Sequence, residues 1–489
     1  MKAILAIDQG TTSTRAILFS LKGKKILSSQ LEINQYFPKN GWVEHNPNEI
    51  WSKTVKVIKN VIKKSKKLKI EIKTIGITNQ RETTVVWNKK TGKPIYNAIV
   101  WQDRRTESYC NKIKKKENII RKKTGLFIDP YFSATKIKWI LDNIKKAKNL
   151  SNKNLLLFGT IDSFLIWKLT EGKVHATDAT NASRTMLFNL NKNKWDDDIL
   201  KIFKIKKNIL PTVKNSADNF GFASKKILGR KISISAVLGD QQAAAVGQAC
   251  FEKGSVKSTY GTGAFVIMNT GSKKLFSKNK LLTTICYRLN NKTTYALEGS
   301  IFIAGAGVQW LRDKLKLINN AYETEKIAKF KKDNEGIYVV PAFTGLGAPY
   351  WSPNSRGLIT GLTRNSDWKS LVRAVVESVA YQSFDLFESM RKDGLRPKIV
   401  KVDGGMISNN WFSQFLSEIL KIKIIRSNTQ ETTALGVSFM AGYKIGVFKS
   451  LNDIKSNWKK NRDFTPKFSK SYRNKLLQGW RQAIRKTLA

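Results

Sequence analysis

One aspartate stands where two sequence patterns meet. The stretch "ISISAVLG" (232–239) is rich in β-branched and apolar residues and predicts a strand, whereas "QQAAAVGQA" (241–249) is rich in helix formers. Asp240 lies between them, directly after Gly239. In open α/β sheets, ligands bind at such ends of strands. Asp240 therefore either faces a ligand or caps the helix, because Asp is also a favoured N-cap residue.

The stretch "IDQGTTSTR" (7–15) combines groups that suit a polyphosphate. Gly10 permits a tight turn, and the backbone N–H groups of such a turn form an anion-binding nest. The four hydroxyl residues 11–14 add donors, and Arg15 adds a charged fork that suits phosphate. Asp8 suits a hydrated Mg²⁺, which favours oxygen ligands. The alternative is a threonine-rich hairpin turn without a ligand.

Two further turns have related compositions. The stretch "STYGTGAF" (258–265) is a second hydroxyl- and glycine-rich turn, so the two turns would hold one polyphosphate between them. The stretch "DGGMISNN" (403–410) allows the backbone to approach a flat ligand, with Asn409 or Asn410 to hydrogen-bond it. These turns predict a nucleotide-sized site with parts far apart in the sequence.

The elements that must position these turns alternate between strand-like and helix-like patterns, which indicates an α/β fold. Strands are expected at 3–10, 14–20, 24–33 and 72–80, and a helix at 46–65. The same strand–turn–strand order begins again at 254–263, with further strands at 264–271 and 293–300. We therefore expect two domains of one architecture, residues 1–248 and 249–489.

The charge is strongly positive. The 489 residues include 88 Lys plus Arg and 36 Asp plus Glu, a net charge of +52, which would suit a nucleic-acid-binding protein. The lysines are spread along the chain, however, and the clusters at 63–70, 111–123 and 201–208 alternate with isoleucine at roughly helical spacing. Such clusters indicate solvated helix faces, so we expect no specific nucleic-acid partner.

The cysteines and the N-terminus indicate where the protein works. Cys110, Cys250 and Cys286 are few and far apart, which excludes a disulfide framework and favours a reducing compartment. The N-terminal apolar run is too short for a signal peptide, and no run approaches the length of a membrane span. We expect a cytoplasmic protein without membrane insertion.

At this level the motifs resemble a known family. "IDQGTTSTR" (7–15), "ITNQRETTVVW" (77–87), "NAIVWQDRR" (97–105), "GDQQAA" (239–244), "TYGTGAF" (259–265) and "VDGGMISNN" (402–410) resemble the glycerol-phosphorylating subgroup of the FGGY carbohydrate kinases. The resemblance covers residues 3 to about 445. It implies an α/β fold of two ribonuclease-H-like, actin-like ATPase domains that flank a deep catalytic cleft, with the N-terminal domain binding glycerol and phosphate and the C-terminal domain binding the nucleotide.

The resemblance also implies a role for individual residues. Contacts with glycerol fall to Arg81, Glu82, Trp101, Tyr131, Asp240, Gln241 and Phe265. A donor fork beside an acceptor carboxylate, as in Arg81 and Glu82, suits a vicinal diol. Asp240 matches the catalytic base. Nucleotide contacts fall to Thr11, Thr12, Ser13, Arg15, Thr262, Gly305, Gln309, Gly405 and Asn409, and Asp8 matches the carboxylate that orders Mg²⁺.

The implied reaction uses ATP and Mg²⁺ to convert glycerol to sn-glycerol 3-phosphate. An alternative comes from the same fold, because actin-like ATPases and sugar-metabolism regulators bind without transferring phosphate. Those proteins would lack the set of Arg81, Glu82, Tyr131 and Asp240, all of which are present here. The resemblance therefore favours the kinase.

Regulation is expected to differ from that of many bacterial relatives. They bind fructose 1,6-bisphosphate at a glycine-rich loop that meets its copy across a tetramer interface. The corresponding stretch here, "FASKKILGRKISIS" (222–235), keeps Gly229 but has Ile227 and Leu228 where glycines would be needed. We therefore expect insensitivity to this effector and a homodimer, with a homotetramer as the alternative.

Overall fold

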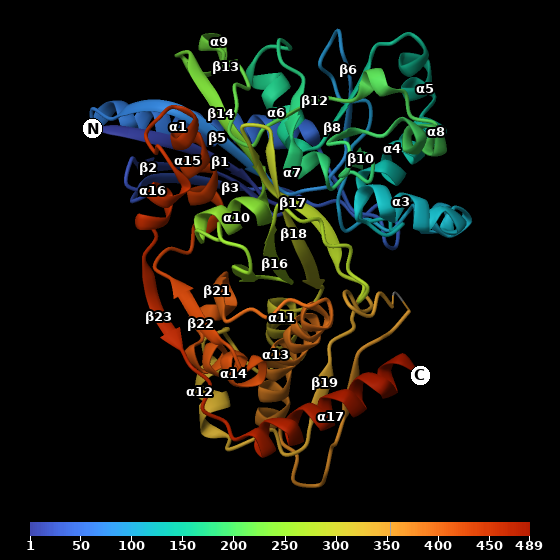
Figure 1. The fold of residues 1–489 in the computed structure, drawn as a ribbon, viewed down its shortest axis with the longest axis vertical. Coiled ribbons are helices and arrows are strands. Elements are labelled where there is room, and N and C mark those ends of the chain that lie inside the picture. Colours follow the sequence, from blue (N-terminus) through green and yellow to red (C-terminus); the bar gives the residue numbers. More distant parts are fainter. Residues whose placement is uncertain (353) are drawn as a thin grey trace.

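Two large mixed sheets form the centres of two lobes, which lie one above the other in Figure 1. The computed structural model describes residues 1–352 and 354–489. The sheet of the first lobe has the strand order β13 (Phe222–Ala223), β14 (Ile232–Gly239), β5 (Glu71–Asn79), β1 (Lys2–Gln9), β2 (Ser13–Ser20), β3 (Lys25–Glu32). The sheet of the second lobe has the order β17 (Leu282–Leu289), β18 (Lys292–Ile301), β16 (Ala264–Gly271), β15 (Val256–Tyr260), β21 (Ile399–Asp403), β22 (Lys423–Ser427), β23 (Lys460–Phe464).

The two sheets repeat one strand pattern. In the first, β1 pairs antiparallel with β2 and parallel with β5, and β14 continues the parallel side. In the second, β15 pairs antiparallel with β16 and parallel with β21, and β22 continues the parallel side. This repetition confirms the predicted fold of two ribonuclease-H-like lobes. The division of the chain at 248/249 stays a prediction.

The first sheet forms where the sequence predicted it, and its inner strand β1 is apolar on both faces. Seven of the eight residues of β1 are buried. Helix α1 (Pro47–Lys67) covers the sheet; its N-cap is Asn46, whose side chain accepts a hydrogen bond from the backbone N–H of Asn48. Ile50, Val57 and Val61 on α1 are buried. The predicted start at the Asn-Pro pair is confirmed.

Two helices that are far apart in the sequence pack tightly where the lobes join. Helix α10 (Asp240–Gly247) and helix α15 (Thr432–Lys444) cross at Gly247 and Gly436, where an added Cβ atom would overlap backbone atoms of the other helix. Helix α15 lies between β22 and β23 of the second lobe in the chain, yet it packs on β14, β5 and β1 of the first lobe (Figure 1). This crossing places the first turn of α10 at the cleft.

The segment between β5 and β14 is long, and part of it, including Trp101 and Tyr131, lies on the side that faces the second lobe. It contains short strand pairs and the helices α2 (Glu107–Lys112), α3 (Glu117–Thr124), α4 (Ser133–Asn143), α5 (Lys145–Asn152), α6 (Ile161–Leu169), α7 (Ala179–Ala182), α8 (Asp197–Phe203), α9 (Lys225–Leu228). The strands are β6 (Val85–Asn88), β7 (Ala98–Ile99), β8 (Leu156–Gly159), β9 (Ala176–Asp178), β10 (Phe188–Asn189), β11 (Lys194–Trp195), β12 (Thr212–Lys214), and β7 pairs with β4 (Glu44–His45).

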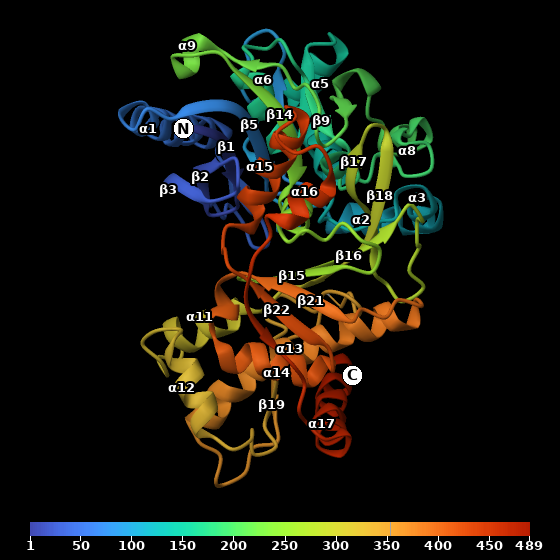
Figure 2. The ribbon, with the colours of Figure 1, turned by 60° about the vertical axis from the view of Figure 1, so that its left-hand side comes forward.

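Helices of the second lobe cover its sheet on the side away from the first lobe (Figure 2). They are α11 (Gly305–Asp313), α12 (Glu323–Phe330), α13 (Trp368–Lys392), α14 (Asn410–Leu420) and α17 (Lys470–Leu488). The lobe also contains the strand pair β19 (Tyr338–Val340) and β20 (Leu358–Thr360), and α16 (Leu451–Ser456) lies between β22 and β23 in the chain. The apolar core of this lobe includes Val376, Phe387 and Trp480.

The expectation that each lysine cluster is the solvated face of a helix is wrong in part. Residues 63–67 do belong to α1, and residues 63, 64, 66 and 67 are exposed. In the third cluster, helix α8 ends at Phe203 because Lys204 adopts a left-handed conformation, with a φ of 53°.

The three cysteines are free and buried. Among the described residues, no helix is long and apolar enough to cross a membrane.

Candidate active site

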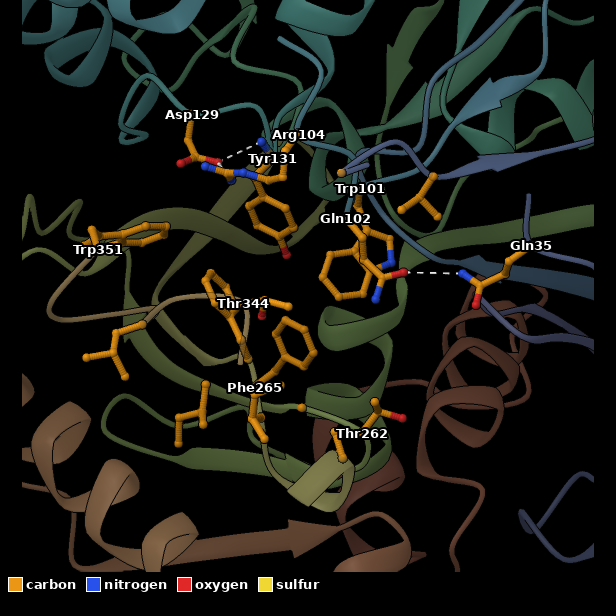
Figure 3. A pocket seen from close by; sticks show the side chains of 18 of the residues that line it. Gln35, Trp101, Gln102, Arg104, Asp129, Tyr131, Thr262, Phe265, Thr344 and Trp351 are labelled. Atoms are coloured by element: carbon orange, nitrogen blue, oxygen red, sulfur yellow. Dashed lines mark hydrogen bonds and ion pairs between the residues drawn. The ribbon is translucent and has the colours of Figure 1, made fainter. Parts of the chain in front are cut away.

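A cavity of about 480 Å³ opens between the lobes, and aromatic side chains form its walls (Figure 3). Trp101 and Tyr131 come from the first lobe and Phe265 from the second. The ring centroids of Trp101 and Tyr131 are 5.7 Å apart, and those of Trp101 and Phe265 are 6.0 Å apart. The Tyr131 hydroxyl points into the cavity in Figure 3. The cavity therefore offers apolar walls and a hydroxyl group to a small ligand.

A second cavity of about 480 Å³ lies within the second lobe. Its lining includes five residues that the sequence predicted for nucleotide contact: Thr262, Gly305, Gln309, Gly405 and Asn409. Thr262 also lines the first cavity, so the two cavities adjoin at this residue. An added Cβ atom at Gly305 would overlap the backbone of Gly261, so the start of α11 approaches the β15–β16 turn closely. The structure thus places these residues, which are far apart in the sequence, around one space.

The two hydroxyl- and glycine-rich turns are equivalent hairpins, one in each lobe. The turn between β1 and β2 closes with a hydrogen bond from Gly10 N to Ser13 O (2.9 Å), and that between β15 and β16 with one from Gly261 N to Gly263 O (2.9 Å). In the first turn, Thr12 is exposed and the side chains of Thr11 and Ser13 are partly exposed. The Trp101 indole N–H donates to Thr11 Oγ1 (2.9 Å), which joins this turn to the cavity wall.

Arg15 and Asp8 lie at the same end of the first sheet. The Arg15 guanidinium pairs with Asp8 and with Glu431, the latter at 2.7 Å. Glu431 comes from the loop before α15, so Arg15 joins the first hairpin to a distant part of the chain. Asp8 is 3 % exposed. Burial raises the pKa of Asp8 against the opposing charge of Arg15, and the charge of Asp240 adds to the increase.

Asp240 opens helix α10 but does not cap it. The N-cap is Gly239, and Asp240 Oδ1 accepts a hydrogen bond from the adjacent Gln241 N–H at 2.7 Å. Arg81 Nε lies 3.1 Å from the same oxygen, and the Asp240 side chain remains 29 % exposed. Burial raises the pKa of Asp240, although Arg81 and Lys257 oppose this. The helix-cap alternative is therefore wrong, and the carboxylate has a raised affinity for a proton.

Glu82 is held in a backbone conformation that few side chains adopt. Its φ is 59°, in the left-handed region. The Glu82 carbonyl accepts a hydrogen bond from Ser133 Oγ at 2.8 Å, and its carboxylate accepts one from Arg184 Nε at 2.6 Å. Burial raises the pKa of Glu82, with Arg184 and Arg81 opposing. These bonds fix the Glu82 carboxylate. Arg184, which binds it, also contacts Tyr131, because its guanidinium carbon lies 5.5 Å from the centre of the Tyr131 ring.

Arg81 points its guanidinium at a residue that sequence reasoning missed. Its Nη1 and Nη2 atoms lie 2.6 and 2.9 Å from the two carboxylate oxygens of Glu298. Glu298 is fully buried on β18 and also lies 3.2 Å from Arg184 Nη2. Burial opposes the ionisation of Glu298, yet Arg184 and Arg81 hold its pKa below the usual value.

Lys257 is a second missed residue. It is fully buried on β15, and its ammonium group donates to the side-chain oxygen of Gln241. The signal for Lys257 and Glu298 is a charged residue within a segment that predicts a strand, "SVKSTY" (255–260) and "YALEGS" (295–300). Lys, Arg and Glu are almost never fully buried unless they are paired, so such a position indicates a buried partner.

The donor set fits a hydrated magnesium ion. No group of three or more His, Cys, Asp or Glu side chains suited to hold a metal occurs among the residues described. Mg²⁺ keeps several waters in kinase sites and needs only one or two carboxylates beside the substrate phosphates. Asp8 and Asp240 are close enough that the charge of Asp240 raises the pKa of Asp8. A cation between these carboxylates would relieve that repulsion.

Comparison with known protein families shows which family the chain matches. Residues 3–247 match the N-terminal domain of the FGGY family of carbohydrate kinases, and residues 256–445 match its C-terminal domain. The chain belongs to the FGGY family of carbohydrate kinases. The family predicted from the motifs is thereby confirmed. The matched ranges place the β1–β2 hairpin in one family domain and the β15–β16 hairpin in the other.

Within the FGGY family, the chain is similar to several glycerol kinases. The chain is 53 % identical to a glycerol kinase of Coxiella burnetii (strain RSA 493 / Nine Mile phase I), over 99 % of this chain and 97 % of the relative. It is 54 % identical to a glycerol kinase of Alteromonas mediterranea, over 98 % of each. The structure of Plasmodium falciparum glycerol kinase with ADP superimposes with a TM-score of 0.94 at 40 % identity, covering 100 % of this chain and 99 % of that one.

Proposed function

We propose that this FGGY kinase transfers the γ-phosphoryl group of ATP to a terminal hydroxyl of glycerol, giving sn-glycerol 3-phosphate, with Asp240 as the general base. One observation carries the proposal. The aromatic cavity and the nucleotide-sized cavity adjoin at Thr262, and Asp240 lies beside Arg81 at the start of α10. The relatives that are 53 % and 54 % identical over nearly the full chain are glycerol kinases, which supports glycerol as the acceptor.

Glycerol would be recognised by a small set of polar groups between apolar walls. Trp101 and Phe265 contact its carbon chain, and the Tyr131 hydroxyl bonds one of its hydroxyls. The Glu82 carboxylate accepts from a second hydroxyl, and Arg81 donates to it. Each glycerol hydroxyl both donates and accepts, so a donor beside an acceptor matches adjacent hydroxyls. Gln241, held by Lys257, completes the contacts.

ATP would lie with its adenosine in the cavity of the second lobe and its phosphates between the two hairpins. Thr262, Gly305, Gln309, Gly405 and Asn409 line the adenosine end. The hydroxyls and backbone N–H groups of Thr11, Thr12 and Ser13 face the phosphates, and Arg15 neutralises their charge. Contacts with Glu431 and Asp8 hold Arg15 at this end of the sheet.

Magnesium would be held by Asp8 and its water ligands. When bound, Mg²⁺ neutralises charge on the phosphate oxygens. The residues of this chain supply the rest of the chemistry. Asp240 orients the terminal hydroxyl and accepts its proton as the bond to phosphorus forms. The raised pKa of Asp240, caused by burial, makes this carboxylate a stronger base than an exposed aspartate. Closure of the lobes over the cleft would exclude water and prevent ATP hydrolysis.

The assembly proposed is a homodimer that lacks the effector-stabilised tetramer. In segment 222–235, residues 225–228 form one turn of helix. The backbone N–H groups of Ile227 and Leu228 donate to Ser224 O, and that of Gly229 donates to Lys225 O. These groups are therefore engaged within the turn and do not form an anion nest. The exposed lysines nearby offer charge without that geometry.

A coupled assay tests the proposal. Purified protein, ATP and Mg²⁺ are incubated with glycerol, other polyols and five-carbon ketoses, and ADP release is followed. Glycerol is expected to be the best acceptor. Faster phosphorylation of a pentulose would show that the subgroup assignment is wrong, and ADP release that is independent of any acceptor would show an ATPase.

A further inference from the structure

Five charged side chains of alternating sign form a chain next to Tyr131 of the aromatic cavity. Four of them are buried, and Asp240 is partly exposed. The order is Asp240, Arg81, Glu298, Arg184, Glu82, with nitrogen–oxygen distances between successive members of 3.1, 2.6, 3.2 and 2.6 Å. The two ends are the carboxylates proposed to act on glycerol. The middle member is Glu298, which contacts both arginines. A change at the middle is therefore transmitted to both ends through charged contacts.

The charged residues of this set are far apart in the sequence, and the middle one, Glu298, comes from the second lobe. Arg81 and Glu298 are 217 residues apart. Glu298 lies on β18 of the second sheet, opposite Ile267 of β16 and Leu282 of β17. Its side chain is fully buried among these strands. The second lobe thus sets the position of a residue pair that belongs to the first.

Geometry shows what Glu298 does to Arg81. Both Nη atoms of Arg81 bind its carboxylate, a bidentate arrangement that fixes the plane of a guanidinium. With the plane fixed, Arg81 Nε lies 3.1 Å from Asp240. Arg184 contacts both carboxylates, because its Nε atom donates to Glu82 at 2.6 Å and its Nη2 atom forms an ion pair with Glu298 at 3.2 Å. The rings of Tyr131 and Phe132 lie 5.5 and 5.3 Å from its guanidinium carbon.

The negative charge of Glu298 also stabilises the positions of Arg81 and Arg184. Arg81 and Arg184 are both buried, and the charge of Arg81 lowers the pKa of Arg184, whereas Glu298 and Glu82 raise it. Glu298 lies between them and compensates this repulsion. Without its charge, two guanidinium groups would face each other in a dry interior, and at least one would move. Movement of Arg81 would displace the donor proposed for glycerol, and movement of Arg184 would release Glu82.

We propose that Glu298 is a positioning residue for substrate recognition, which holds Arg81 and Glu82 in the arrangement that binds glycerol. The inference rests on the proposed function, because it explains how the proposed glycerol-binding side chains are held in position. Glu298 needs no contact with glycerol. Its effect is expected in the KM for glycerol, whereas the nucleotide cavity lies on other elements and is expected to be unaffected.

The test is the Glu298→Gln variant of the full chain, assayed with glycerol and with ATP as the varied substrate. Glutamine keeps the shape but removes the charge, so Arg81 and Arg184 are expected to separate. We expect the KM for glycerol to rise about tenfold or more and the KM for ATP to change less than about twofold. Glu298→Asp keeps the charge but is shorter by one methylene, and an intermediate rise of about threefold is expected. If Glu298→Gln does not fold, Glu298→Asp carries the test.

The matched control is Glu377→Gln in the second lobe. Glu377 is equally buried and pairs with Arg373 Nε at 2.7 Å on helix α13. We expect this variant to lower the thermal midpoint without a selective change in the KM for glycerol. Folded Glu298 variants with an unchanged KM for glycerol would overturn the inference, as would equal changes in both KM values. Absence of glycerol phosphorylation by the wild-type chain would contradict the proposed function instead.

Discussion

Replacement of Asp240 by Asn separates a proton acceptor from a structural residue. Asparagine has nearly the same shape, and its Oδ1 atom can still accept the hydrogen bond that Gln241 N donates to the carboxylate at 2.7 Å. The ion pair with Arg81 Nε, at 3.1 Å in the wild type, is lost with the charge. It does not accept the proton of an attacking hydroxyl. General-base loss costs about 10² to 10⁴ in rate, which corresponds to about 3 to 5 kcal/mol in the activation barrier. We expect kcat to fall by that factor while nucleotide binding is kept.

The Asp240→Asn variant is not expected to lose stability, whereas loss of a helix cap would lower the unfolding free energy. Burial raises the pKa of Asp240 above its unfolded value, so ionisation of this group opposes folding at neutral pH. Asparagine removes that cost, and we expect an unfolding free energy equal to or above that of the wild type. Loss of an N-cap would instead lower it by about 1 kcal/mol.

The assay is ADP release by the Asp240→Asn variant, with urea unfolding and nucleotide titration on the same preparation. The wild-type rate is expected to fall as the pH decreases through the raised pKa of Asp240, because protonation removes the base. That acidic limb is expected to be absent from the variant. A variant that turns over at the wild-type rate, whether or not it is less stable, would refute the base assignment.

Three other predictions concern regulation, packing and charge. Because the backbone N–H groups of residues 227–229 are bonded within a helical turn, activity should not change with micromolar fructose 1,6-bisphosphate; saturable inhibition with tetramers in sedimentation would contradict this. Gly436→Ala should destabilise the chain by about 3 kcal/mol in urea unfolding, because its Cβ atom would overlap the carbonyl oxygen of Ala243; an unchanged midpoint would show that the helices separate freely. DNA binding, measured by fluorescence anisotropy, should be weak and vanish near about 0.2 M salt; tight binding in that salt would support a nucleic-acid function.

The parts predicted correctly from the sequence depend on local patterns. Strand β1 is an apolar run and β15 contains the β-branched residues Val256 and Thr259; glycine and threonine turns follow both strands. Helix α1 begins at an Asn-Pro pair. Each signal lies within about ten residues, so both hairpins and the repeated architecture could be inferred before their partners were known. The candidate residues of the cavities were found through the family's motifs rather than through spacing.

The chain of charged contacts from Asp240 to Glu82 could not be predicted in this way. The partner of Arg81 is 217 residues away, and the partner of Glu82 is 102 residues away. A single charge within an apolar strand shows that a partner exists but not which one. The same limit applies to α15, whose position on the first sheet depends on two glycines that meet across distant helices.

A crystal structure of the chain with glycerol and ADP tests the central claim most directly. The account predicts a terminal hydroxyl of glycerol within hydrogen-bonding reach of the Asp240 carboxylate, about 2.6 to 3.2 Å, with Arg81 still paired to Glu298. The aromatic rings of Trp101 and Phe265 should contact the glycerol carbons. Glycerol bound away from Asp240, with another base at its terminal hydroxyl, would contradict the account.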